Sequence, residues 1–144
     1  MEVSPDPHQL WRRLLEVLAP RFGMYLVTSG HPETQSRKVE LLQIQSFFDG
    51  VYYVNRDLGE RKLRVFAELL ARTGLAAEAV LCVGDRPDRE IQSARQLGMR
   101  TVRVRGGEYA HLDPDGPEEE ADFVVGHVTE LWQVLAELGH ALPN

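Results

Sequence analysis

The sequence has little cysteine, no long hydrophobic run and no excess of positive charge. Its one cysteine, Cys82, lies inside an apolar run, so no disulfide can form within one chain and a buried, inert thiol is predicted. The longest apolar runs span only a few residues, which excludes a membrane-spanning helix. The first ten residues show neither the basic nor the apolar region of a signal peptide. These absences predict a cytoplasmic protein that does not bind membranes.

The charge balance is acidic, with 22 Asp and Glu against 16 Lys and Arg, a formal net charge of -6. Binding to a nucleic-acid backbone needs a basic face, so no nucleic-acid partner is expected. The hydrophobic fraction of 43% and the charged fraction of 26% are those of an ordinary globular protein. A chain of 144 residues predicts a single domain over residues 1–144.

Short apolar runs rich in Val and Tyr alternate with helical patterns along the chain. Such runs, bounded by turn residues, are typical of buried strands. The predicted strands are residues 24–28, 51–54, 79–83, 101–104 and 123–125. Strand-helix alternation predicts an α/β fold with a mostly parallel sheet and helices on both faces.

Helix boundaries can also be predicted from the sequence. Pro32 suits the first turn of a helix that we expect to run to about Gln45. Glycines close helical patterns at Gly74, Gly98 and Gly139.

Residues 105–122 are rich in Gly, Pro and acids, which predicts a solvated surface loop that could alternatively cover a site. Gly106-Gly107 at its start does not form a GxGxxG fingerprint, so dinucleotide binding has little support.

The most informative stretch is residues 81–99, LCVGDRPDREIQSARQLGM. An apolar run ends in Gly84-Asp85, and a second acid follows at Glu90. Carboxylates at the carboxyl end of a buried strand lie where α/β sheets keep their chemistry, and Mg2+ prefers such oxygen ligands. The alternatives are a turn or N-cap aspartate at Asp85 and a helix cap at Asp88 or Glu90.

Three further residues could bind an anion, two at the end of the first strand and one at the start of a helix. Thr28 and Ser29 end the first strand, and their hydroxyls could hold an anion with the next helix start, or else cap that helix. Lys62 begins a helix, where its cation opposes the helix dipole. It needs either solvent or an anionic partner, and a phosphate is one option.

Together these features resemble the haloacid dehalogenase-like (HAD) superfamily over roughly residues 10–138. LVTSG resembles the second motif of that family, with Thr28 at its end, and Lys62 resembles the third-motif lysine. VGDRPDREIQSARQLGM resembles the fourth motif, with Asp85 as the first acid and Glu90 as the second, where the family mostly has Asp.

The resemblance implies a three-layer Rossmann-like core without a cap domain and a phosphotransfer site. In that family an aspartate of a DxDxT motif attacks phosphorus, and the Thr and Lys neutralise the phosphoryl oxygens. Thr28, Ser29 and Lys62 would then bind phosphate, and Asp85 and Glu90 would hold Mg2+. The implied partner is a small phosphorylated molecule.

The sequence departs from the family because it contains no DxDxT. Asp6 lies between two prolines and is a poor candidate for the nucleophile, so no catalytic residue is assigned. We expect a truncated chain that lacks the central first-motif strand. Strands 24–28 and 79–83 would then pair directly, or another chain would fill the slot, and a homodimer is one such arrangement.

Three functions remain open from the sequence. The first is a Mg2+-dependent phosphohydrolase by ancestry, impaired because the nucleophile is missing. The second is a non-catalytic module for phosphoryl-ligand binding or dimerisation. The third is an unrelated doubly wound domain with Asp85 as a turn residue. The hydrolase hypothesis requires Thr28, Lys62 and Asp85 to converge around one cleft.

Overall fold

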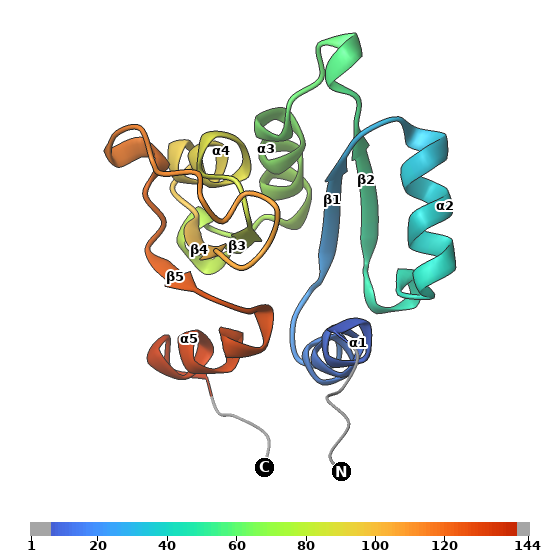
Figure 1. The fold of residues 1–144 in the computed structure, drawn as a ribbon, viewed down its shortest axis with the longest axis horizontal. Helices are drawn as coiled ribbons and strands as arrows, with labels where there is room; N and C mark the ends of the chain where they lie inside the picture. The colour runs from blue at the N-terminus through green and yellow to red at the C-terminus, as the bar shows by residue number, and fades with distance from the viewer. Residues whose placement is uncertain (1–6, 141–144) are drawn as a thin grey trace. The chain divides into compact units, whose positions relative to one another are not determined.

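The computed structural model describes residues 7–140, so Asp6 lies outside the described residues. The chain divides into two compact units, with the boundary between Glu60 and Arg61. Figure 1 shows the elements of each unit in chain order. That the two units form one domain stays a prediction.

The first unit is built on a parallel pair of strands. Strands β1 (Tyr25–Ser29) and β2 (Gly50–Val54) run in register, with Thr28 opposite Tyr53 and Ser29 opposite Val54. Helix α2 lies beside β2 (Figure 1). A buried cluster of Leu15, Val39 and Ile44 packs against half-buried aromatic and apolar side chains and forms the core of this unit. Its elements are α1 (Pro7–Leu18), β1 (Tyr25–Ser29), α2 (Pro32–Leu42), a 3-10 turn (Gln45–Phe47), β2 (Gly50–Val54) and a 3-10 turn (Arg56–Leu58).

Helix α2 ends at Leu42, so the predicted end at about Gln45 is wrong. Gln43 adopts a left-handed conformation with φ 54°, and its N–H donates to the carbonyl of Glu40. This turn lets Ile44, which is 5% exposed, enter the core. A left-handed non-glycine residue leaves no clear sequence signal, because Gln rarely adopts that conformation.

The second unit carries a three-stranded parallel sheet in the order β3-β4-β5. Helices α3 and α4 of this unit lie side by side (Figure 1). Its helices and strands are α3 (Lys62–Thr73), β3 (Leu81–Gly84), a π-helical turn (Pro87–Ile91), α4 (Gln92–Gln96), β4 (Arg100–Val104), β5 (Phe123–Val125) and α5 (Leu131–Glu137). Short 3-10 turns occur at Ala77–Ala79, Pro117–Glu119 and Val128–Glu130.

The predicted helix stops are confirmed. Gly74 caps α3 with φ 69°, and its N–H donates to the carbonyl of Leu70. Gly98 and Gly139 also have positive φ, at 87° and 91°. Glycine adopts this left-handed conformation without a Cβ penalty, which is why it ends helices.

The α/β fold and its parallel ladders are confirmed, but the strands are not equally buried. In β4 the residues Thr101, Val102 and Arg103 are all at most 1% exposed, whereas Val83 on β3 is 37% exposed. Strand β1 has no fully buried residue. The prediction of five buried strands therefore holds best for β4.

The edges of the two sheets explain this difference. Within residues 7–140, β1 forms a ladder with β2 alone and β3 with β4 alone. Strands β1 and β3 belong to different units, so the expected direct pairing of strands 24–28 and 79–83, or the filling of the slot by another chain, stays a prediction. Each of these strands keeps one edge whose backbone groups have no ladder partner among the described residues, as is typical of edge strands.

No helix within residues 7–140 is both long enough and apolar enough to cross a membrane.

Candidate functional site

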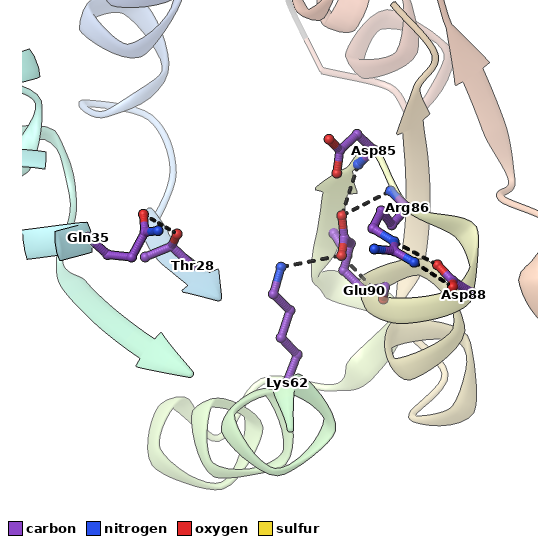
Figure 2. A network of polar contacts seen from close by, with 8 residues as sticks. Thr28, Gln35, Lys62, Asp85, Arg86, Asp88 and Glu90 are labelled. Carbon is purple, nitrogen blue, oxygen red and sulfur yellow. Dashed lines mark hydrogen bonds and ion pairs between the residues drawn. The ribbon is translucent and has the colours of Figure 1, made fainter. Parts of the chain in front are cut away.

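Glu90 is the centre of a polar network at the carboxyl end of β3 (Figure 2). Its Oε1 accepts hydrogen bonds from the backbone N–H groups of Asp85, at 3.0 Å, and Arg86, at 3.1 Å. Its Oε2 lies 3.3 Å from Nζ of Lys62, the first residue of α3. Glu90 is 5% exposed. A buried carboxylate needs this kind of pairing, because an isolated buried charge is strongly unfavourable.

The close approach of Glu90 to the strand end depends on Gly84. A Cβ added to Gly84 would lie 2.2 Å from Cγ and 2.7 Å from Oε1 of Glu90. The π-helical turn Pro87–Ile91 brings Glu90 back under the turn at residues 85–86. Single π-helical turns of this kind occur frequently at functional sites.

The pKa values of the two acids in this network, Asp85 and Glu90, are shifted in opposite directions. Burial alone would raise the pKa of Glu90, but the Lys62 cation and the hydrogen bonds that the carboxylate accepts hold this pKa below its usual value. Burial raises the pKa of Asp85, and so do a hydrogen bond with the Glu90 carboxylate and the charge of that group. Neighbouring carboxylates whose pKa values are pushed apart are typical of acid and cation sites.

Cys82 lies behind this network. Its Sγ is 3.8 Å from the carbonyl oxygen of Glu90, and burial raises the pKa of the thiol to about 12. A thiol with this pKa stays protonated near neutral pH, and the reactive species is the thiolate. The side chain is half-buried, and the inertness of this thiol stays a prediction.

Asp88 pairs with Arg86 and does not cap a helix. The guanidinium of Arg86 donates to Asp88 through Nε, at 2.9 Å, and through Nη2, at 2.7 Å. This hydrogen bond lowers the pKa of Asp88. The same guanidinium lies 4.5 Å from the ring centroid of Tyr109. The N-cap residue of the π-helical turn is Arg86, and its side chain forms no cap hydrogen bond. Of the two acids that were expected as alternative caps, Glu90 accepts from the Arg86 N–H and Asp88 does not act as a cap.

Thr28 and Ser29 end β1 as predicted, and neither of them caps α2. The N-cap residue of α2 is His31, and no side-chain cap is formed there. The hydroxyl of Thr28 donates to Oε1 of Gln35, on α2, at 3.3 Å (Figure 2). The Oγ of Ser29 is buried and has no hydrogen-bond partner among the described residues. The two hydroxyls therefore keep capacity for a further partner.

The structure brings Lys62, Asp85 and Glu90 into one network, so a solvated Lys62 is excluded. Thr28 and Ser29 belong to the other unit, and their convergence with this network stays a prediction.

The donor set at Asp85 and Glu90 is compatible with Mg2+. No group of three or more His, Cys, Asp or Glu side chains that could hold a metal occurs within residues 7–140. Two carboxylates nevertheless fit this ion, because Mg2+ keeps several waters and is usually bound through one or two carboxylates and substrate phosphates. The metal assignment of Asp85 and Glu90 stays a prediction.

Sequence reasoning missed three residues that support the candidate site, Gln35, Arg103 and Tyr109. Gln35 gave no signal beyond its place in the first turns of α2. Arg103 did carry one, because a charged residue between the two valines of a predicted buried strand is unusual unless it has partners. Tyr109 lies in the segment that was predicted to be a plain loop.

A family profile described as HAD-hydrolase-like matches residues 60–131, which is half of the chain. This chain is a HAD protein. The matched residues include Lys62, Asp85 and Glu90, whereas Thr28 and Ser29 precede them.

Curated relatives of this HAD chain are named phosphatases. It is 35% identical to the glyceraldehyde 3-phosphate phosphatase of Methanocaldococcus jannaschii over 94% of this chain and 58% of that protein. It is 30% identical to the phosphoserine phosphatase of Thermus thermophilus over 83% of this chain and 47% of that protein. The chain thus spans about half the length of the curated relatives it matches.

A solved structure agrees on the fold. The putative HAD-hydrolase YfnB from Bacillus subtilis, bound to magnesium, superposes with a TM-score of 0.71 and 23% identity, over 85% of this chain and 53% of that one. The predicted Rossmann-like α/β fold of the HAD superfamily is thereby confirmed.

Proposed function

We propose that this HAD chain binds a small phosphorylated molecule together with Mg2+, on a site that descends from a phosphomonoester hydrolase. The network of Lys62, Glu90 and Asp85 at the carboxyl end of a parallel strand carries this proposal. It sets an ammonium group and two acids at the rim where α/β sheets bind ligands. The phosphatase names of the curated relatives support the same class of ligand.

Each residue of the network has a distinct role in this proposal. Asp85 would be the direct ligand of Mg2+, and its pKa is raised by burial and by the neighbouring Glu90 carboxylate, against the lowering effect of the Lys62 cation. Glu90 uses both oxygens within the protein, so it fixes the Asp85 turn and would support the metal only through water. Lys62, with a side chain 15% exposed, faces the phosphoryl oxygens. Thr28 and Ser29 supply hydroxyl donors. Bound Mg2+ neutralises phosphoryl charge.

The covalent step is impaired in this proposal. The 144 residues contain no DxDxT, so no carboxylate in them is assigned to attack phosphorus. Removal of a nucleophile typically lowers the rate by about 10^4 or more, while binding groups persist. We therefore expect the chain to bind phosphate and Mg2+ with little or no turnover.

The alternative is a non-catalytic module that binds a phosphoryl ligand or forms a dimer. The edges of β1 and β3, which have no ladder partner among the described residues, favour this alternative, because such edges can pair with another strand. The cytoplasm is the expected location in either case.

An assay with two readouts tests the proposal. Hydrolysis of p-nitrophenyl phosphate, glyceraldehyde 3-phosphate and phosphoserine is measured with Mg2+. Binding of inorganic phosphate and Mg2+ is measured by calorimetry. Asp85→Asn should remove Mg2+ binding, and Lys62→Met should weaken phosphate binding, while Lys38→Met serves as the control because Lys38 is an exposed lysine.

The two readouts separate the candidate functions. Turnover that Asp85→Asn abolishes would identify a working hydrolase and contradict the impairment. Binding without turnover is the expected result. A chain that binds neither phosphate nor Mg2+ would contradict the proposed function.

A further inference from the structure

Two arginines, one within β4 and one directly after it, hold the loop of residues 105–113 against the sheet. Arg103 donates through Nη2 to the carbonyl oxygens of Tyr109, at 3.0 Å, and Leu112. Arg105 donates through Nε to the carbonyl oxygen of Ala110, at 2.7 Å. The 105–113 loop is therefore held in place through its backbone and is not a freely solvated segment.

Arg105 adds an ion pair at the far end of the loop, where its Nη2 lies 2.5 Å from Asp113. Its own N–H donates to the carbonyl oxygen of Val125, at the end of β5, at 2.7 Å. The start of the loop is thus joined to β5 through its backbone, and the far end is joined to the Arg105 side chain.

Arg103 is unusual because it is a cation in the middle of a buried strand. It is 1% exposed, its Nε has no hydrogen-bond partner, and no carboxylate within residues 7–140 forms an ion pair with it. Burial lowers the pKa of this arginine. A buried charge needs compensation, and here the carbonyl oxygens of the loop supply it. In the β3-β4 ladder Arg103 lies opposite Gly84, the residue before Asp85.

The loop returns to the Asp85 turn through an aromatic contact. The Tyr109 ring lies under the guanidinium of Arg86, 4.5 Å from centroid to Cζ, and Asp88 holds that guanidinium from another side. The backbone N–H of Arg86 is one of the two groups that Glu90 binds. Gly84 therefore pairs with Arg103 in the sheet, Arg103 binds the backbone of Tyr109, and the Tyr109 ring contacts Arg86. Arg86 follows Asp85, so these contacts connect both sides of the Asp85 turn.

We propose that Tyr109 is a positioning residue that acts through Arg86 to fix the Asp85 turn. Glu90 holds this turn through its two backbone N–H groups, and Tyr109 holds it through the Arg86 side chain. The role of Asp85 as a cation ligand rests on the proposed function, whereas the mechanical role of Tyr109 does not. A cation over an aromatic ring contributes about 0.5–1 kcal/mol at exposed sites and more when it is shielded from water.

Amide hydrogen exchange measures the mechanical role directly. The N–H groups of Asp85 and Arg86 should exchange about tenfold faster in Tyr109→Ala, because opening of the turn becomes easier. Tyr109→Phe keeps the ring face and should keep the slow exchange. The N–H of Met99, which donates to Ala94 at 2.9 Å, is the internal reference for general loss of stability. Tyr25→Ala removes a ring from the other unit and is the matched control.

Mg2+ affinity, measured by calorimetry, is the second readout. Tyr109→Ala should weaken Mg2+ binding severalfold, and Tyr109→Phe should restore it, which a merely structural loss would not produce. Unchanged exchange at Asp85 and Arg86 in Tyr109→Ala would overturn the proposal, and so would an equal acceleration at Met99. If the unaltered chain binds no Mg2+, the proposed function fails, and the exchange experiment still decides the role of Tyr109.

Discussion

The acidic turn of the second unit and the end of β1 in the first unit differ in how completely the chain itself satisfies their polar groups. In the second unit Glu90 uses both carboxylate oxygens, on two backbone N–H groups and on Lys62. In the first unit the Oγ of Ser29 has no partner among the described residues, and Thr28 makes one hydrogen bond of 3.3 Å. The acidic turn of the second unit is preorganised from within, whereas the hydroxyls at the end of β1 in the first unit keep free hydrogen-bonding capacity.

This contrast indicates where substitutions should act. A change at the saturated network should lower the stability of the protein first, because each group there compensates a buried neighbour. A change at Thr28 or Ser29 should leave stability nearly unchanged and act on ligand binding alone.

Lys62→Met should have the largest effect on stability. It leaves the Glu90 carboxylate, with a side chain 7% exposed, without its counter-ion. Removal of one partner of a buried ion pair costs about 3–5 kcal/mol, so we expect a loss of about 3 kcal/mol in urea unfolding. The double variant Lys62→Met/Glu90→Gln should recover most of this loss. A loss below about 0.5 kcal/mol, as expected for the exposed Lys38→Met, would show that the pair is not effectively buried.

Gly84→Ala should have the next largest effect. The new Cβ would lie 2.2 Å from Cγ of Glu90, so Glu90 must move away from the Asp85 turn. Overpacking of this kind costs about 1–3 kcal/mol. Gly107→Ala is the matched control, because nothing lies within 4 Å of its added Cβ. Thermal unfolding would measure both variants, and equal melting temperatures would contradict the close packing.

The dependence of stability on pH should reveal the lowered pKa of Glu90. Its pKa is lowered in the folded protein by Lys62 and by its hydrogen bonds, against the effect of burial. Its stabilising contribution is therefore fully present above the unfolded pKa of about 4.3 and is lost as the pH falls through the folded pKa. The difference in unfolding free energy between the unaltered chain and Glu90→Gln should shrink below about pH 4. A difference that does not vary with pH would exclude a lowered pKa.

Asp85→Asn should have the smallest effect on stability, and one of opposite sign. The pKa of Asp85 is raised by burial and by Glu90, so its ionised form opposes folding near neutral pH. We expect a rise in the melting temperature on the order of 2 °C at pH 7, a gain that disappears below the unfolded pKa of about 3.9. The variant should at the same time lose Mg2+ binding. A lower melting temperature would indicate that the Asp85 carboxylate stabilises the fold.

Much of the second unit could be predicted from the sequence. Gly84-Asp85 followed by Glu90 and a glycine-terminated helix indicated the acidic turn, because these residues occur at fixed local spacing. The parallel strands followed from apolar runs that alternate with helical patterns. Such features depend on neighbours in the sequence, so they can be read without knowledge of the fold.

The contacts that depend on distant parts of the chain could not be predicted. The Lys62–Glu90 pair joins residues 28 positions apart, and the Arg86–Tyr109 contact joins residues from two different connections. The end of α2 at Leu42 depends on the left-handed Gln43, which a pattern of apolar residues does not reveal. The open edges of β1 and β3 likewise depend on which strands pair, and that pairing is a property of the folded chain.

The protonated state of Cys82, whose pKa burial raises to about 12, makes this molecule well suited to labelling experiments. Maleimide and disulfide reagents attack thiolates, so we expect them to react only slowly with this residue in the native protein. Cysteines placed at exposed positions on the two units will thus take up fluorophores or spin labels without interference, and the distance between the hydroxyl-bearing strand and the acidic turn becomes measurable in solution.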